Sequence, residues 1–317
     1  MIDKFGRDIT YLRLSVTERC NLRCRYCMPE DGICKKKPEE MLTEKEMIQA
    51  VWAASSLGIT KVRITGGEPL IKSNIISICK KTMAVPDIQE VCITTNGILL
   101  PKLAKPLKEA GVTRINISLD TLDEEKYAFL TRTGHLDKAI DGLKAALEAG
   151  FEKIKINTVL LGGFNDDEIP TLAGLTKKYP VDVRFIELMP MYDGGDFGPE
   201  AYIPHSIVTE KLPDLEPIKS DGGVAKLFKF PDGKGNIGLI SPVNAHFCKS
   251  CNRLRLTADG KLKPCLHSGD EFSIKGMNFL QMKEQMEKAI LEKPAYHGEL
   301  SYYQRSNANR NMNQIGG

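Results

Sequence analysis

Three closely spaced cysteines near the start of the chain could bind a metal cluster. Cys20, Cys24 and Cys27 follow a C-x3-C-x2-C spacing directly after a predicted β-strand. Three thiolates in one short loop can bind three irons of a cubane cluster and leave the fourth iron for an exchangeable ligand. A zinc ion with a distant fourth ligand is the alternative, because zinc sites also use C-x2-C pairs. The spacing, at the end of a first strand, favours the iron–sulfur cluster.

A second cysteine triplet lies towards the C-terminus. Cys248, Cys251 and Cys265 form a C-x2-C-x13-C pattern, which again leaves one coordination position without a thiol. The spacing by itself fits a zinc ribbon completed by His246 or His267, and it also fits a second iron–sulfur cluster. Both interpretations stay open at the level of spacing.

The other three of the nine cysteines have no metal-binding spacing. We expect Cys79 and Cys92 to be small buried apolar residues, and Cys34 to be a loop thiol outside the first triplet. The charged start of the sequence does not resemble a signal peptide, and no apolar run reaches the roughly 18–20 residues of a membrane span. These features predict a cytoplasmic protein whose thiols are reduced or bound to metal.

Basic side chains interrupt the apolar runs of several predicted strands. They alternate with apolar residues, which places them on one face of each strand. A barrel would direct these faces into one cavity, where Arg and Lys bind phosphates through charge-assisted hydrogen bonds. We therefore predict a site for a polyanion such as a triphosphate. The residues concerned are Arg13, Lys61, Arg63, Lys155, Arg184, Arg253 and Arg255.

The overall composition is that of a globular protein of 317 residues, with 42% apolar and 27% charged residues. Lys and Arg number 44 against 41 Asp and Glu, which gives a net charge of +3 and a pI near 8.3. This near balance excludes a strongly basic nucleic-acid-binding chain, so the positive potential is local.

Short β-rich runs alternate with amphipathic helical stretches in the first part of the chain. The predicted strands are residues 11–16, 62–65, 91–95, 114–119, 154–160 and 181–187. Helices are predicted over residues 43–57, with Thr43 and Glu46 as a capping box, over 136–149, over 165–178 with Asn165 as its cap, and over 277–291. Residues 190–236 are predicted to be irregular with a short hairpin. The alternation predicts a parallel α/β sheet, open or curled into a partial barrel.

Two motifs together resemble the signature of radical S-adenosylmethionine (SAM) enzymes. The first triplet has an aromatic residue, Tyr26, before its last cysteine, and Gly66, Gly67, Glu68 and Pro69 follow the second predicted strand. The resemblance implies that the open iron chelates SAM and that the glycines let the backbone approach its methionine part. A phosphate-binding P-loop is excluded, because the glycine required before its lysine is missing.

The second triplet and its surroundings resemble the GTP 3′,8-cyclase (MoaA) family of radical SAM enzymes, and the likeness covers almost the whole chain. Cys-Asn-Arg-Leu-Arg-Leu, starting at Cys251, and Pro-Cys-Leu, ending at Leu266, carry it. The resemblance implies a partial (βα)6 TIM-like barrel over residues 1–225, and a C-terminal region over 226–317 with a second cluster and a Gly–Gly tail. It also implies two [4Fe–4S] clusters and SAM as cofactors.

The resemblance further implies an activity, namely conversion of GTP to (8S)-3′,8-cyclo-7,8-dihydroguanosine 5′-triphosphate in the first step of molybdenum cofactor synthesis. In this reaction a radical derived from SAM takes a hydrogen from C3′ of GTP, and C3′ then bonds to C8 of guanine. GTP and an electron donor are the implied partners, without a membrane or nucleic acid, and a homodimer is one assembly compatible with the sequence.

The same resemblance implies roles for individual residues. The implied iron ligands are Cys20, Cys24, Cys27, Cys248, Cys251 and Cys265. The implied GTP contacts are Arg13, Lys61, Arg63, Thr94, Lys155, Arg184, Arg253 and Arg255. The implied SAM contacts are Tyr26, Gly67, Ser118 and Met189. Gly316 and Gly317 are implied to reach the active site and to be needed for activity.

Two alternative functions differ in their expected metal content or substrate. A peptide-modifying radical SAM enzyme would usually carry more C-terminal cysteines, and it leaves the basic strand residues unexplained. A zinc-stabilised nucleic-acid-binding module would contain zinc without acid-labile sulfide.

Overall fold

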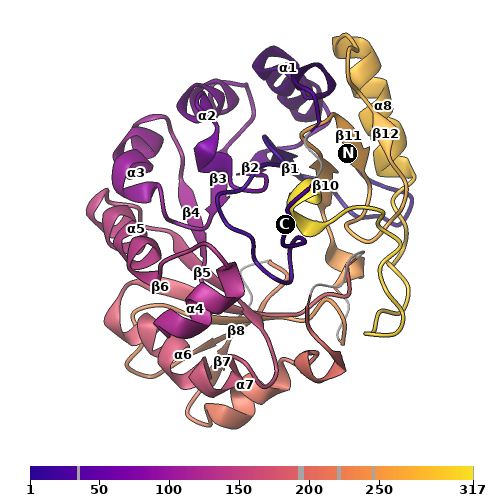
Figure 1. The fold of residues 1–317 in the computed structure, drawn as a ribbon. Helices are drawn as coiled ribbons and strands as arrows, with labels where there is room; N and C mark the ends of the chain where they lie inside the picture. The colour runs from indigo at the N-terminus through magenta and orange to yellow at the C-terminus, as the bar shows by residue number, and fades with distance from the viewer. Residues whose placement is uncertain (34–35, 192–195, 220–222, 245–246, 317) are drawn as a thin grey trace.

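A computed structural model describes the chain at residues 1–317, apart from residues 34–35, 192–195, 220–222, 245–246 and 317. The described residues form a 12-stranded sheet in the order β12-β11-β10-β1-β2-β3-β4-β5-β6-β9-β8-β7. Strands β1 to β6 are parallel to one another, with β10 parallel beside β1 and β9 parallel beside β6. The strands curl inside a ring of helices, and the C-terminus lies near the centre of that ring (Figure 1).

The first six strands alternate with helices and confirm the predicted partial (βα)6 barrel. The strands are β1 (Tyr11–Ser15), β2 (Lys61–Thr65), β3 (Glu90–Thr95), β4 (Arg114–Ser118), β5 (Ile154–Leu160) and β6 (Val181–Glu187). The helices are α1 (Glu44–Ser55), α2 (Ile75–Met83), α3 (Leu100–Glu109), α4 (Glu124–Thr131), α5 (Leu136–Glu148) and α6 (Ile169–Lys178). Each predicted strand is present with ends that differ by no more than one residue.

The barrel strands have an apolar outer face and a polar inner face. Leu12 and Leu14 of β1 belong to the apolar core that also contains Met47 and Ala50 of α1. Arg13 lies between these leucines, and because successive side chains of a strand point to opposite faces, it lies on the inner face. The inner face can therefore carry a polar site while the outer face packs against the helices.

The ends of two helices test the predicted caps. The Thr43 side chain accepts a hydrogen bond from the Glu46 N–H, at 3.2 Å, and the Glu46 carboxylate accepts one from the Thr43 N–H, at 2.8 Å, so the capping box of α1 is confirmed. The cap predicted at Asn165 is wrong. A short 3₁₀ turn precedes α6, and the Asn165 side chain instead donates to the carbonyls of Asp120 and Val159, at 2.7 and 2.8 Å.

The C-terminal part of the chain extends both edges of the barrel sheet. Its elements are α7 (Ser206–Lys211), β7 (Glu216–Ile218), β8 (Lys226–Lys229), β9 (Ile237–Ile240), β10 (Arg253–Leu256), β11 (Lys261–Lys263), β12 (Phe272–Ser273), α8 (Phe279–Leu291) and α9 (Met312–Ile315). The predicted hairpin is formed by β7 and β8, whereas α7 was not predicted. The domain division at residue 225 stays a prediction.

Helix α8 packs beside α1 on the outside of the ring, as Figure 1 shows. Within the described ranges, no helix has both the length and the apolar character that crossing a membrane requires.

Candidate active site

The first cysteine triplet lies in the loop after β1. The backbone N–H groups of Cys27 and Met28 donate to the Cys24 carbonyl, at 2.9 and 3.2 Å, and the Leu22 N–H donates to Cys20 Sγ at 3.4 Å. Burial raises the pKa of Cys20 to about 11 and that of Cys27 to about 12. Burial, and then the neighbouring Cys27, raise the pKa of Cys24 well above its usual value. As thiolates, these three side chains would repel one another. A positively charged iron–sulfur core would offset that repulsion, so the triplet is a suitable donor set for such a cluster.

The glycine motif after β2 packs against the backbone of this cysteine loop. The Gly67 N–H donates to the Thr17 carbonyl, and the Glu68 N–H donates to the Arg19 carbonyl, both at 2.8 Å. A Cβ on Gly66 would lie 2.5 Å from the Thr17 oxygen, and one on Gly67 would lie 2.3 Å from the Arg19 oxygen. The glycines therefore permit the close approach of these two loops. Contact of Gly67 with SAM stays a prediction.

The Glu68 side chain joins this motif to the loop after β3. Its carboxylate accepts hydrogen bonds from the N–H groups of Leu70 and Asn96, at 2.9 and 2.7 Å, and from the Thr95 hydroxyl at 2.8 Å. Burial raises the pKa of Glu68 to about 7. The buried carboxylate thus helps to fix the two loops that flank the first triplet.

The residues predicted to contact SAM all lie at the ends of barrel strands. Tyr26 lies after β1, Gly67 after β2, Ser118 ends β4, and Met189 follows β6. The Tyr26 hydroxyl donates to Asp120 Oδ2 at 2.7 Å, and Met189 packs against an apolar cluster that includes the C-terminal tail. Because parallel strands end at one edge, these residues share the edge that carries the first triplet, where (βα) barrels place their active sites.

Three of the predicted phosphate-binding arginines lie side by side on adjacent strands. The register pairs Arg13 of β1 with Arg255 of β10 and with Arg63 of β2, and we call these three residues the arginine row. Burial, and then Arg255, lower the pKa of Arg13 well below its usual value, while burial, and then Arg253, lower the pKa of Arg255 to about 10. Arg63 Nη1 donates to Thr94 Oγ1 at 3.0 Å. A bound polyanion would stabilise this buried positive charge.

Tyr11, which the sequence analysis did not select, lies among these cations. The centre of its ring is 5.8 Å from Arg63 Cζ, 5.9 Å from Arg253 Cζ and 5.2 Å from Lys61 Nζ, and its hydroxyl accepts a hydrogen bond from Arg63 Nε. Arg253 Nε is buried and has no hydrogen-bond partner among the described residues, so it retains a donor for a ligand. The signal for Tyr11 was its position two residues before Arg13, on the same face of β1.

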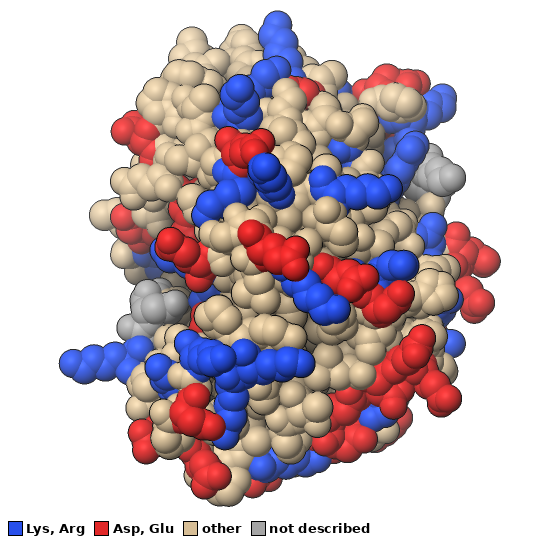
Figure 2. Space-filling model, turned by 90° about the vertical axis from the view of Figure 1, so that its left-hand side faces the viewer, with Lys and Arg blue, Asp and Glu red and all other residues tan. Residues whose placement is uncertain are grey.

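The other predicted cations have acidic or basic neighbours on the inner face. Lys61 Nζ lies 2.5 Å from Glu90 Oε2, and Lys155 Nζ lies 2.9 Å from Asp182 Oδ2. Burial, and then Arg184, lower the pKa of Lys155, which shows that these two cations lie close together. On the outer face drawn in Figure 2, by contrast, basic and acidic residues are interspersed.

The second cysteine triplet is also a set of coupled thiols. Burial raises the pKa of Cys248, and Cys265 and Cys251 contribute to that rise. Burial acts in the same direction on Cys251, but the combined effect of Lys293, Arg253 and Arg255 outweighs it, so the pKa of Cys251 is lowered. Lys293 is 4% exposed, and its Nζ lies 3.6 Å from Cys251 Sγ and 2.7 Å from the Pro264 carbonyl oxygen. A buried cation that donates to a ligand thiolate fits an anionic metal site.

The two triplets lie at opposite ends of the parallel strands. The first follows the C-terminal end of β1, whereas Cys248 and Cys251 precede the N-terminal end of β10, which runs parallel to β1. A five-residue strand such as β1 rises roughly 15 Å. Because Arg13 is the middle residue of β1, the arginine row lies between the two triplets.

The described residues do not form the zinc site considered for the second triplet. His267 Nδ1 lies 3.2 Å from Ser306 Oγ, and its ring centre lies 4.7 Å from that of His297. Among the described residues, no three His, Cys, Asp or Glu side chains could hold one metal ion. His246, like Cys34, lies outside the described residues.

The two remaining cysteines differ in their surroundings. Cys79 is buried in the apolar core, as predicted. Cys92 is also buried, but its thiol donates to Glu90 Oε1 at 3.2 Å and it lies opposite Arg63 in the register of β2 and β3. The expected apolar setting of Cys92 was wrong, because the residue lies on the inner face, which is polar.

The C-terminal tail reaches both the arginine row and the first triplet. The Gly316 carbonyl accepts hydrogen bonds from Arg13 Nη2 at 3.1 Å and from Arg255 Nη1 at 3.0 Å. Gly316 has a φ of 78°, and a Cβ on it would lie 2.7 Å from Thr65 Cγ2, so both its conformation and its space require glycine. The Asn313 side chain donates from Nδ2 to the Glu18 carbonyl, in the loop before the first triplet, at 3.1 Å, and the Asn313 backbone N–H acts to lower the pKa of Cys27. Gly317 lies outside the described residues.

Comparisons with known proteins agree with this arrangement. Residues 14–175 match the radical SAM superfamily, and residues 181–299 match the family described as Molybdenum Cofactor Synthesis C. The chain is 45% identical over 321 residues to a GTP 3′,8-cyclase of Alkaliphilus oremlandii, with 100% of both chains covered. It is 44% identical over 320 residues to a GTP 3′,8-cyclase of Clostridium botulinum, again with 100% of both covered.

Solved structures share the fold at low sequence identity. Streptococcus suis SuiB bound to S-adenosylmethionine has a TM-score of 0.68 and 16% identity, with 92% of this chain and 67% of SuiB covered. Methylornithine synthase (PylB) has a TM-score of 0.53 and 17% identity, with 66% of this chain and 63% of PylB covered. Radical SAM enzymes use SAM and a [4Fe–4S] cluster, and the first triplet has the donors for that cluster. The chain belongs to the radical SAM superfamily and, within it, to the GTP 3′,8-cyclase family.

Proposed function

We propose that this chain converts GTP to (8S)-3′,8-cyclo-7,8-dihydroguanosine 5′-triphosphate, the first step of molybdenum cofactor synthesis. The observation that carries the proposal is the buried arginine row between two coupled cysteine triplets. A triphosphate supplies the negative charge that this row lacks. The full-length similarity to proteins named GTP 3′,8-cyclase supports the same substrate.

The inner face divides the binding of GTP between two groups of residues. The arginine row, with Arg253 and Thr94, binds the phosphates, and Lys61, Lys155 and Arg184 complete the basic lining. Holding the triphosphate at fixed donors restricts the nucleoside to one orientation, which lowers the entropic cost of reaction at C3′ and C8. The buried inner face also keeps water from the reacting carbons.

Cys20, Cys24 and Cys27 would hold the [4Fe–4S] cluster, and Tyr26, Gly67, Ser118 and Met189 would contact SAM. When bound and reduced, this cluster supplies the electron that cleaves SAM to give a hydrogen-abstracting radical. The chain's own contribution is to hold the loop and to exclude water around it, through the glycine motif and the buried Glu68 carboxylate.

Cys248, Cys251 and Cys265 would hold a second [4Fe–4S] cluster, whose remaining coordination position suits the guanine base. An electron donor must reduce the first cluster, and we place the enzyme in the cytoplasm, where thiols stay reduced. A homodimer stays a prediction.

Metal analysis and substrate consumption test the proposal together. Anaerobically reconstituted protein is expected to contain about eight irons per chain with matching acid-labile sulfide. Incubation with GTP, SAM and dithionite is expected to consume GTP, and ATP serves as the matched control nucleotide. Zinc without sulfide would refute the cluster assignment. Cleavage of SAM without consumption of GTP would refute the cyclase activity while leaving the family assignment intact.

A further inference from the structure

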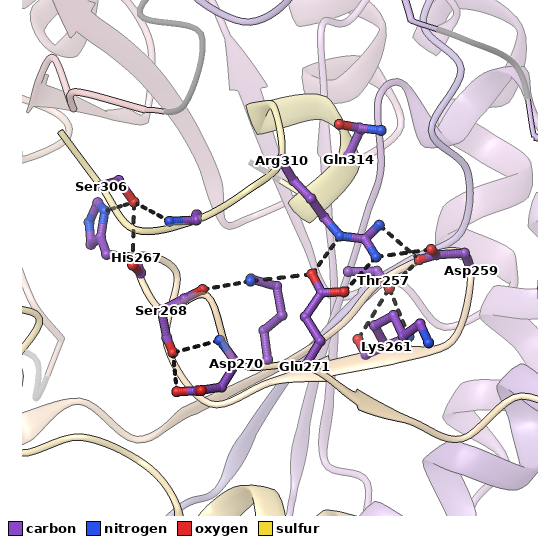
Figure 3. A network of polar contacts seen from close by, with 12 residues as sticks. Thr257, Asp259, Lys261, His267, Ser268, Asp270, Glu271, Ser306, Arg310 and Gln314 are labelled. Atoms are coloured by element: carbon purple, nitrogen blue, oxygen red, sulfur yellow. Dashed lines mark hydrogen bonds and ion pairs between the residues drawn. The ribbon is translucent and has the colours of Figure 1, made fainter.

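Arg310 lies at the centre of a network of ion pairs between the C-terminal tail and the strands that carry the arginine row (Figure 3). Its Nε and Nη2 atoms lie 2.5 and 2.7 Å from the two carboxylate oxygens of Glu271. Its Nη1 and Nη2 atoms lie 3.1 and 3.0 Å from the two carboxylate oxygens of Asp259. The guanidinium is therefore held by two carboxylates at once, with a paired geometry that only arginine provides.

Both carboxylates lie in connections of the antiparallel segment formed by β10, β11 and β12. Asp259 lies in the turn between β10 and β11, where its Oδ1 accepts a hydrogen bond from Thr257 Oγ1 at 2.5 Å. Glu271 lies just before β12 and is 3.4 Å from Nζ of the fully buried Lys263. Since β10 also carries Arg255, the two carboxylates that hold Arg310 and one member of the arginine row belong to the same β10–β11–β12 segment.

The network also reaches the loop of the first triplet. Arg310 Nη1 lies 3.6 Å from Glu18 Oε1, and Lys36 Nζ lies 3.2 Å from the same oxygen. The Glu18 side chain is 4% exposed, and its backbone carbonyl accepts a hydrogen bond from Asn313 Nδ2 at 3.1 Å. Arg310 thus contacts both parts of the site: the loop of the first triplet through Glu18, and the β10–β11–β12 segment through Asp259 and Glu271.

A short helical segment connects Arg310 to the active-site end of the tail. Asn311 and Gln314 form a capping box at the start of α9, and the Ile315 side chain is buried. A register fixed at residue 310 is therefore transmitted to residues 313 and 316, which contact the loop of the first triplet and the arginine row.

We propose that Arg310 is a positioning residue for the active site. Its two carboxylate partners set the register of residues 311–316, so that the Asn313 side chain meets the Glu18 carbonyl and the Gly316 carbonyl meets Arg13 and Arg255. The role rests on the proposed function, because it assumes that the tail contributes to GTP cyclisation. The proposal gives Arg310, which lies outside the Gly–Gly end, the role of holding the tail in place in the active site.

Three variants of the reconstituted full-length enzyme test this role. Arg310→Gln removes the charge and the paired geometry, and Arg310→Lys keeps the charge but not the geometry. Lys226→Gln removes one positive charge from an exposed position on β8, outside the tail, and is the matched control. Hydrogen exchange measured by mass spectrometry reports how strongly the backbone amides of residues 311–316 are protected, without any substrate.

In Arg310→Gln we expect amide exchange in residues 311–316 to rise by about tenfold to hundredfold, since hydrogen bonds to charged groups are lost. We expect kcat for GTP to fall by a similar factor with unchanged iron content, and the ratio of SAM cleaved to GTP consumed to rise. Arg310→Lys should lie between wild type and Arg310→Gln, and Lys226→Gln should match wild type. Wild-type exchange in Arg310→Gln would overturn the proposal, and so would faster exchange with unchanged kinetics.

Two provisions keep the test decisive. If Arg310→Gln does not fold, Glu271→Gln removes one carboxylate partner and leaves Asp259, and the same two measurements then apply with smaller expected effects. If the wild-type enzyme consumes no GTP, the proposed function fails, but the exchange measurement still decides whether Arg310 seats the tail.

Discussion

Replacing Arg255 by glutamine is expected to stabilise the ligand-free protein and to weaken GTP binding. Arg255 is 6% exposed, and burial, followed by Arg253, lowers its pKa from 12.5 to about 10. At 1.36 kcal/mol per pH unit, that difference of about 2.5 units corresponds to roughly 3 kcal/mol. Because the folded-state pKa lies below the unfolded value, this destabilisation is fully present below about pH 10 and declines as pH rises toward 12.5.

Glutamine removes the charge but keeps an N–H donor for the Gly316 carbonyl. Subtracting about 1 kcal/mol for lost hydrogen bonding leaves a net gain of roughly 1–2 kcal/mol, or a few degrees in Tm. The same change removes a charge-assisted contact to phosphate, which is expected to weaken the Kd for GTP by about tenfold to hundredfold.

Anaerobic thermal melts and calorimetric titration with GTP measure the two effects. Lys226→Gln is the matched control, because it removes one positive charge from an exposed position on β8. The reasoning is refuted if Arg255→Gln lowers Tm, or if its affinity for GTP equals that of the wild type.

The other predictions concern the loops and the second triplet. Gly67→Ala places a Cβ 2.3 Å from the Arg19 carbonyl oxygen, so we expect loss of about half of the bound iron by colorimetric analysis; full iron content would contradict this. Gly316→Ala places a Cβ 2.7 Å from Thr65 Cγ2 at a positive φ, so we expect at least tenfold lower GTP turnover with normal iron content, and normal turnover would refute this account of the tail. Lys293→Met removes a buried cation that donates a hydrogen bond to Cys251 Sγ. A redox titration followed by electron paramagnetic resonance should therefore show a lower reduction potential for the second cluster. An unchanged potential would exclude this electrostatic role.

The barrel could be predicted from the sequence because its signals are local. Alternation of Leu12, Arg13 and Leu14 shows both a strand and a polar face, and Thr43 with Glu46 marks the start of α1. Among the described helices, α2, α3, α4, α7 and α9 were not predicted, although Asp123 caps α4. The N-caps of α2 and α3 make no side-chain hydrogen bond, and α3 contains an internal proline.

The polar interior and the position of the tail depend on contacts between residues far apart in the sequence, which local sequence patterns do not predict. Arg310 meets Glu271 and Asp259 across 39 and 51 residues of sequence, and the Arg13 contact with Gly316 spans 303 residues. Composition marks the tail as polar, but only the folded barrel brings its partners to one place. The setting of Cys92 was missed for the same reason, since the charge of its neighbours comes from adjacent strands.

Transfer of deuterium from GTP labelled at C3′ tests the central claim most directly. The reconstituted, reduced enzyme is incubated anaerobically with SAM and the labelled GTP, and the 5′-deoxyadenosine formed is analysed by mass spectrometry. If the arginine row holds the triphosphate so that C3′ faces the SAM site, the 5′-deoxyadenosine gains one deuterium, and Arg255→Gln reduces the amount formed. Unlabelled 5′-deoxyadenosine, produced while GTP remains unchanged, would contradict the proposed function.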